Sequence, residues 1–375
     1  MKGAIRLGSI RGIEIGIHYN WLLIFLLVAW SLAMGYFPQT YPGWDRLTYW
    51  ITGVIASLLL FVSVLLHELA HSFVAQARGL PVRSITLFIF GGVSNIVREA
   101  EKPKTELAMS VVGPLTSLVI AGIFWGIFLV APNKLSPLAA LLFYLAQINA
   151  LLTAFNLLPG FPLDGGRVLR SILWGATNNL VRATNIAATV GQVLGWGMIG
   201  VGIIVAFRVN LLSGLWLAFV GWFLNNAAES SRQETSLQAY LKGVKVKDVM
   251  VPSPQTISPS TPVWEVVQGI FRQYHRRAVP VAQDGKLVGI VTITNVRELP
   301  QERWATTPVE AIMTRAPLRC VTPEDDLSHA LTLIAQYDVN QVLVCIGEQL
   351  VGILSRADII RHLQFAQELG LRRKA

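Results

Sequence analysis

Apolar and polar residues are distributed very unevenly along this chain. Long apolar stretches separated by short polar ones occupy residues 17–227, whereas the part after residue 227 is much more polar. About twenty consecutive apolar residues are enough for a helix to cross a bilayer. The pattern therefore predicts a polytopic α-helical membrane protein with a soluble tail. Its six predicted spans are residues 17–37, 50–77, 106–131, 137–158, 186–207 and 211–227.

A shorter pattern between the second and third spans predicts strands. Residues 79–97 read GLPVRSITLFIFGGVSNIV, with an apolar, β-branched run up to Phe90, then Gly91-Gly92 and a second short run. This pattern is typical of a β-hairpin. The edge of such a hairpin can pair with an extended peptide, or the hairpin can simply cap a cavity. The sequence favours neither of these roles.

The second span contains ionisable residues, which is unusual at membrane depth. Residues 51–77 carry no charge except Glu68, and residues 67–71 read HELAH. His67 and His71 are four residues apart, so they lie on one helix face where both can bind one metal ion. Glu68 lies beside them, where it can take a proton from a metal-bound water. Because ionisable groups are costly inside a membrane, we interpret the motif as a metal site.

A second polar cluster follows the fourth span. Residues 153–170 read TAFNLLPGFPLDGGRVLR, in which two prolines interrupt the helix and Asp164 precedes two glycines. A catalytic zinc usually has three protein ligands, so Asp164 is the candidate third ligand. Considered alone, Asp164 would instead be the N-cap of the next helix. Asn156 can donate a hydrogen bond to a substrate carbonyl or oxyanion, or to a neighbouring helix.

The two motifs together resemble the signature of the site-2 protease family of intramembrane zinc metalloproteases, HExxH followed by Asn-x-x-Pro-x-x-Pro-x-Asp-Gly. The resemblance covers residues 13 to about 225. It implies one zinc ion (Zn²⁺) per chain, bound by His67, His71 and Asp164. It also implies that Glu68 is the general acid/base and that Asn156 is a catalytic residue that polarises the scissile carbonyl. The implied substrate is a transmembrane helix of another protein, cleaved within the lipid bilayer.

The soluble tail contains an internal repeat. Val249-Met250 matches Ile312-Met313, and LVGIV at 287–291 matches LVGIL at 350–354, both with an offset of 63 residues. The tail resembles a pair of CBS domains, an α/β module with adenine-nucleotide clefts in which a hydroxyl contacts phosphate and a carboxylate contacts ribose. The matching cofactor-binding residues are Ser355 and Asp358 in the second repeat, and Thr292 and Asn295 in the first.

The CBS resemblance implies ATP, ADP or AMP as a ligand that modulates the protease. One nucleotide cleft is more credible than two, because asparagine replaces the acid in the first repeat and accepts hydrogen bonds less strongly. The alternative is a scaffold module that binds no ligand and forms a homodimer. The expected domains are a membrane protease domain at 1–227, a helical linker at 228–243, and CBS repeats at 244–304 and 305–370.

Composition and charge agree with this organisation. Hydrophobic residues make up 53% of the chain and charged residues 14%, and the formal net charge is +9. Eleven lysines and arginines flank the predicted spans on one side, whereas the other side has three: Arg46, Lys134 and Arg208. This asymmetry places both termini in the cytoplasm, in the cell inner (plasma) membrane. The positive charge is then explained by the inner leaflet, and nucleic-acid binding need not be invoked.

The chain has two cysteines, Cys320 and Cys345, and both lie in the tail. Two isolated cysteines on the cytoplasmic side of a membrane rarely pair, and their spacing matches no zinc ribbon. We therefore expect two core residues and no disulfide.

Two further functions remain open at this point. A channel or transporter regulated by the CBS pair explains the tail and the polar groups inside the membrane, but not HExxH together with LDGG. A membrane-anchored metallopeptidase that acts on soluble peptides would have the same metal site. The function that we predict is an intramembrane zinc metalloendopeptidase, and no residue identifies its substrate.

Overall fold

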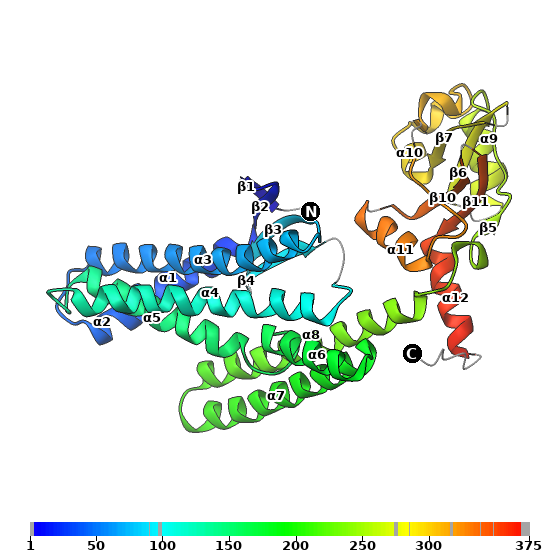
Figure 1. Cartoon of the computed structure of the whole chain (residues 1–375). Helices are drawn as coiled ribbons and strands as arrows, with labels where there is room; N and C mark the ends of the chain where they lie inside the picture. The colour runs from blue at the N-terminus through cyan, green and yellow to red at the C-terminus, as the bar shows by residue number, and fades with distance from the viewer. Residues whose placement is uncertain are drawn as a thin grey trace. The chain divides into compact units, whose positions relative to one another are not determined.

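The structure is a computed structural model that describes residues 4–89, 91–96, 100–273, 277–284, 286–315, 318–337, 339–347 and 349–368. Some residues of the sequence predictions lie outside these ranges, among them Phe90 and Val97 of the hairpin, Lys2 and Arg98 of the charge count, and residues 369–370 of the second repeat. The chain divides into two compact units, Met1–Thr235 and Ser236–Ala375 (Figure 1).

Helices make up most of the first unit (Figure 1). They are α1 (Asn20–Ser31), η1 (Leu32–Tyr36), α2 (Phe37–Thr40), α3 (Arg46–Ala77), α4 (Pro103–Val130), α5 (Pro137–Asn156), α6 (Asp164–Thr177), α7 (Leu180–Arg208) and α8 (Leu211–Leu241). Within the described residues, six helices are long and apolar enough to cross a membrane: the continuous run from α1 to α2, and α3, α4, α5, α7 and α8. The six predicted helices are thus confirmed. The sixth continues to Leu241 instead of ending at 227, so the expected linker is largely part of this helix.

Short polar segments between the helices determine where the helices begin. Asp45 accepts hydrogen bonds from the backbone N–H groups of Leu47 and Thr48 at the start of α3. The hydrogen bonds from Thr48 hold the pKa of the Asp45 carboxyl below its usual value. Ser136 caps α5 in the same way. These side chains satisfy backbone donors that have no partner inside the helix, which fixes the first turn.

A four-stranded sheet packs beside the helices, in the order β1 (Ala4–Ile10), β2 (Ile13–His18), β3 (Val82–Phe88) and β4 (Gly91–Ile96). The predicted hairpin is confirmed as the antiparallel pair β3–β4. β2 runs parallel to β3, and β1 is antiparallel to β2. β1 and β2 were not predicted from the sequence, although IEIGIH at 13–18 alternates in the way that strands do. Ile13 and Ile85 of this sheet share a buried cluster with residues of α3 and α4.

The second unit consists of two similar halves. Its strands are β5 (Val251–Pro252), β6 (Ala278–Gln283), β7 (Lys286–Thr292), β8 (Thr314–Arg315), β9 (Cys320–Val321), β10 (Gln341–Ile346) and β11 (Gln349–Ser355). Its helical segments are η2 (Val246–Asp248), α9 (Val263–Val266), η3 (Val267–Arg272), α10 (Ile293–Arg297), η4 (Gln301–Arg303), η5 (Val309–Ala311), α11 (Leu327–Gln336) and α12 (Arg356–Glu368).

The two repeats exchange their first strands. β5 of the first repeat joins the sheet β5-β11-β10-β9, and β8 of the second joins β6-β7-β8. Pro252 lies opposite Gly352 and Arg315 lies opposite Gly289, so the two pairings are related by the same offset of 63 that the sequence shows. The internal repeat is therefore also a structural repeat, and neither half can complete its sheet without the other.

Cys320 and Cys345 form a disulfide, which corrects the expectation that they do not pair. They lie on the neighbouring parallel strands β9 and β10, and their Cα atoms are 5.8 Å apart, within the usual range for a disulfide. Only Cys345 is a core residue, since Cys320 is exposed. A spacing of 25 residues carries no signature of this pairing, because the strand order brings the two residues together.

Candidate metal centre

Three side chains from two helices meet at one point of the first unit. His67 and His71 lie on α3, and Asp164 is the first residue of α6. The Asp164 Oδ2 atom is 3.1 Å from Nε2 of each histidine, and the two Nε2 atoms are also 3.1 Å apart. Both histidines are buried, with exposed fractions of 4% and 5%. Within the described residues, this trio is the group of His, Cys, Asp and Glu side chains with the spacing of a metal site.

The remaining ring nitrogens of both histidines contact α4. Nδ1 of His67 is 2.9 Å from Ser117 Oγ, and Nδ1 of His71 is 2.5 Å from the backbone carbonyl oxygen of Met109. A carbonyl oxygen can only accept, so His71 donates its Nδ1–H to it and keeps the Nε2 lone pair free. Partners of this kind fix the tautomer and ring orientation of metal-binding histidines.

α4 approaches the two imidazoles at Gly113, which lies between Met109 and Ser117 on the same helix face. A Cβ atom built at Gly113 would lie 2.5 Å from Cε1 of His71 and 2.7 Å from Nε2 of His67. Such distances are far inside van der Waals contact, so only glycine fits there. Met109, Gly113 and Ser117 were not predicted as part of the site. Their regular spacing of four residues was the available signal, but it does not reveal which helix they face.

Glu68 is held by the sheet. Its Oε2 atom accepts a hydrogen bond of 2.7 Å from Ser94 Oγ of β4, and Ser72 Oγ lies 3.3 Å from the same Ser94 oxygen. A Cβ atom at Gly92 would come within 3.1 Å of Glu68 Cδ and still closer to Cγ, so the glutamate side chain packs directly on the β4 backbone. The sheet thus orients the glutamate of the HExxH motif.

The loop between α5 and α6 places Asp164. Leu163 occupies the N-cap position of α6, so Asp164 is not the N-cap that its sequence context alone favoured. A Cβ atom at Gly165 would lie 2.5 Å from the Leu157 carbonyl carbon, and one at Gly166 would lie 2.5 Å from the Gly160 oxygen. The two glycines therefore let the start of α6 pack against the loop, which directs Asp164 toward α3.

Asn156 is the last residue of α5 and is half-buried. The structure does not join it to the three clustered side chains by a hydrogen bond. Its side-chain amide has no hydrogen-bonding partner among the described residues, so the alternative of an interhelical hydrogen bond has no support.

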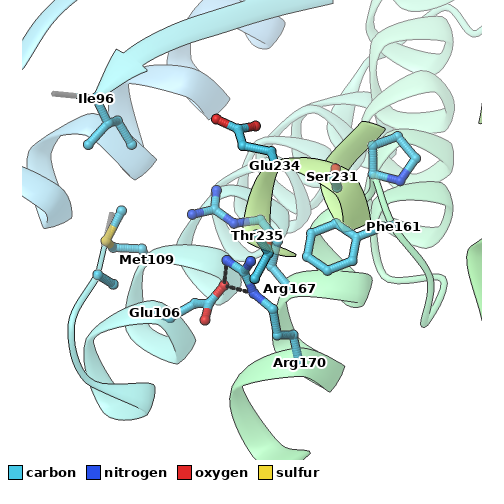
Figure 2. Close-up of a pocket in the computed structure, with 11 residues that line it drawn as sticks. Ile96, Glu106, Met109, Phe161, Arg167, Arg170, Ser231, Glu234 and Thr235 are labelled. Atoms are coloured by element: carbon cyan, nitrogen blue, oxygen red, sulfur yellow. Dashed lines mark hydrogen bonds and ion pairs between the residues drawn. The ribbon is translucent and has the colours of Figure 1, made fainter. Parts of the chain in front are cut away.

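A buried ion pair joins α4 to α6, which both contribute residues to the candidate metal centre (Figure 2). Arg170 donates to Glu106 through Nε at 2.6 Å and also through Nη2. The two residues are 8% and 1% exposed, and the guanidinium lies 5.0 Å from the centroid of the Phe161 ring. Because α4 carries the partners of the histidines and α6 carries Asp164, this pair helps to hold the two helices in register.

The four candidate nucleotide-binding residues form two equivalent pairs in the second unit. Thr292 Oγ1 donates to Asn295 Oδ1 at 2.7 Å, and Ser355 Oγ donates to Asp358 Oδ2 at 2.6 Å. In each pair the backbone N–H of the later residue donates back to the hydroxyl oxygen. The pairs therefore also act as caps for the helices that follow, α10 and α12.

Two family models match the chain: Peptidase family M50 at residues 55–136 and 130–198, and the CBS domain at residues 246–302 and 309–364. Rip3 of Mycobacterium tuberculosis is 36% identical over 96% of this chain and 93% of its own length. Zinc metalloprotease MJ0392 of Methanocaldococcus jannaschii is 31% identical over 98% of both chains. The solved structure of a site-2 protease from Methanocaldococcus jannaschii has 32% identity and a TM-score of 0.42, covering 61% of this chain and 95% of that one.

Proposed function

Because this chain belongs to peptidase family M50 and is a membrane metalloprotease with a CBS pair, we propose that it cleaves peptide bonds within transmembrane helices of other proteins. We assign His67, His71 and Asp164 as the zinc ligands and Glu68 as the general acid/base. The observation that carries this assignment is the convergence of two imidazole nitrogens and one carboxylate oxygen, each within 3.1 Å of the others.

The donor set fits zinc. Two neutral histidine nitrogens and one carboxylate oxygen are a common three-residue ligand set of catalytic zinc sites, which leave a further position open. The outer partners on α4 also fit, because they leave the Nε2 atoms of both histidines available for the metal. Zinc bound there supplies a Lewis acid that makes water a nucleophile near neutral pH and polarises a carbonyl group.

The surroundings of Glu68 support a role in proton transfer. It follows the first histidine directly in the helix, and Ser94 donates to Oε2, so one carboxylate oxygen has a fixed partner while the other is available. In the proposed reaction, Glu68 accepts a proton from the attacking water and then gives it to the leaving nitrogen. Asn156, whose amide has no partner among the described residues, is proposed to donate a hydrogen bond to the scissile carbonyl oxygen.

The outer edge of β4 is the proposed docking strand for the substrate. β4 has one neighbour in the sheet, β3, and its other edge has no backbone hydrogen bond among the described residues. A helix must unwind before one of its peptide bonds can be attacked, and an unwound segment can pair with such an edge. This arrangement supports substrate binding over the alternative in which the hairpin only caps the site.

The proposed location is the plasma membrane, with both termini in the cytoplasm. The excess of lysine and arginine on one side of the spans supports this orientation. In this orientation α3 and α5 both run toward the cytoplasm. HELAH and the loop leading to Asp164 therefore reach similar depths in the membrane. We retain the domain limits 1–227, 228–243, 244–304 and 305–370 as part of the proposal.

For the CBS pair we propose regulation by an adenine nucleotide. Asp358 offers a carboxylate where Asn295 offers only an amide, so replacing Asp358 with alanine should reduce ATP, ADP or AMP affinity at least tenfold, while the matched change at Asn295 should have a smaller effect. Calorimetry on the full-length protein measures both. Equal affinities in the two variants would contradict the assignment. Light scattering in the same buffers tests whether the pair forms a homodimer.

The decisive experiment offers the purified full-length protein two substrates in detergent. One is a single-span membrane protein and the other a soluble peptide, and both contain the same scissile sequence. We expect cleavage of the membrane protein, with about one zinc bound per chain, and loss of cleavage on chelation. Absence of both zinc and cleavage would favour the regulated channel or transporter. Faster cleavage of the soluble peptide would favour a peptidase that is only anchored in the membrane.

A further inference from the structure

A cavity of about 260 Å³ lies beside the metal centre, within the first unit. Its wall includes Ile96 at the end of β4, Met109 of α4, Phe161 of the loop before α6, and Arg167 of α6 (Figure 2). Met109 is the residue whose carbonyl oxygen accepts the hydrogen bond from His71. The cavity therefore adjoins the residues that orient the metal ligands, and none of the roles assigned above uses it.

The charged groups of the cavity are not equivalent. Arg170 is neutralised by its buried ion pair with Glu106. Glu234 also lines the cavity, but it is already engaged in another interaction and is not a free charge. Arg167 is half-buried, and its guanidinium has no hydrogen bond or ion pair with the described residues (Figure 2). A guanidinium has five donors and prefers carboxylate partners, so Arg167 is the group of this cavity that is available to bind an anion.

β4 links this cavity to Glu68. Side chains two residues apart on a strand point to the same face, and Gly92, Ser94 and Ile96 are spaced in this way. Gly92 and Ser94 contact Glu68, whereas Ile96 lines the cavity. The four steps from Gly92 to Ile96 correspond to roughly 13 Å along a strand. A peptide paired with β4 thus has one residue near Glu68 and another, four positions away, on the same face and beside the cavity.

We propose that the cavity is a specificity subsite in which Arg167 binds an acidic side chain of the substrate. The acidic residue lies four positions from the substrate residue opposite Gly92, with its methylene groups against Ile96, Met109 and Phe161. This inference rests on the proposed function and on substrate pairing with β4. The new α-carboxylate of a cleavage product is also an anion that a guanidinium could bind. It forms at the metal, however, about four substrate positions away from the residue that lies beside Arg167.

The test scans a single-span substrate by placing glutamate or glutamine at each of the six positions on either side of the cleavage site, with full-length enzyme in detergent. Wild type is expected to cleave the glutamate form at least tenfold more efficiently (kcat/KM) at one position, with no preference at the two adjacent positions, whose side chains point away. Arg167→Gln should bring this ratio close to one. Arg167→Glu should reverse it toward a substrate with lysine at that position. Arg182→Gln, which removes an exposed arginine of α7, is the matched control and should keep the wild-type ratio.

Each result has a distinct meaning. If no substrate is cleaved in a Glu68-dependent way, the proposed function fails. If cleavage depends on Glu68 but glutamate and glutamine are equivalent at every position, or if the preference survives Arg167→Gln, the subsite is wrong while the function stands. A further arm compares inhibition by product peptides that end in a carboxylate or an amide. If only the carboxylate form inhibits wild type and this difference disappears in Arg167→Gln, Arg167 binds the product terminus and the side-chain assignment is overturned.

Discussion

Replacing Glu68 with glutamine is expected to lower the rate of peptide-bond cleavage by at least a hundredfold while zinc remains bound. Glutamine has nearly the same shape and can still accept the hydrogen bond from Ser94, so the sheet and α3 keep their contact. It cannot take a proton from water, however, and general acid/base catalysis contributes roughly 10²- to 10⁴-fold. The measurements are kcat with a single-span substrate and zinc content per chain on the same preparation.

Glu14 provides the matched control for this substitution. Its carboxylate is exposed and, among the residues that the structure describes, forms an ion pair with Arg6 alone, so Glu14→Gln should retain wild-type activity and zinc. If Glu68→Gln keeps more than a tenth of the wild-type rate, the assignment of Glu68 to proton transfer is wrong. If it loses zinc together with activity, Glu68 belongs to the ligand set or to its support instead.

Replacing Gly113 with alanine is expected to weaken zinc binding at least a hundredfold and to remove activity with it. The added methyl group would overlap both imidazoles, and these rings cannot turn away without breaking their hydrogen bonds to Ser117 and Met109. Loss of such outer partners alone typically costs 10- to 100-fold in metal affinity. The helix itself should tolerate the change, because alanine is the better helix former by about 1 kcal/mol.

Gly122→Ala is the control on the same helix, because a Cβ atom at Gly122 meets nothing within 4 Å. It should bind zinc as wild type does, with unchanged or slightly higher thermal stability. Zinc titration against a competing chelator, together with the melting temperature, separates a local effect from unfolding. Wild-type zinc affinity in Gly113→Ala would show that α4 does not hold the two imidazoles as described.

Part of the candidate site could be predicted because the residues within each of its two motifs lie close together along the chain. His67 and His71 share a helix face simply because they are four residues apart. The prolines and glycines around Asp164 indicate that the helix is interrupted there. The six long helices follow from apolar length, which is also a local pattern. The duplicated tail follows from an offset of 63 residues between two similar segments, which the sequence itself shows.

Other features depend on which surfaces meet. Nothing near HELAH in the sequence indicates that Ser117 and Met109 complete the histidine hydrogen bonds, or that Ser94 binds Glu68 from 26 residues away. The strands β1 and β2 were not predicted, because β2 is completed by its pairing with β3, which comes much later in the chain. The disulfide was wrongly excluded because Cys320 and Cys345 become neighbours only when β9 pairs with β10.

By itself, the sequence determined the candidate metal-binding residue types, the helices that carry them and the two-part organisation of the chain, since helix periodicity and apolar length act locally. The tertiary structure decided the rest: Asp164 reaches the histidines, α4 orients their rings, β4 holds Glu68, and the cavity at Arg167 adjoins them. The hydrogen bonds among these contacts join residues that are 26 to 97 positions apart. Only the packing of whole helices and strands specifies such pairs, because no regular backbone repeat relates residues at those separations.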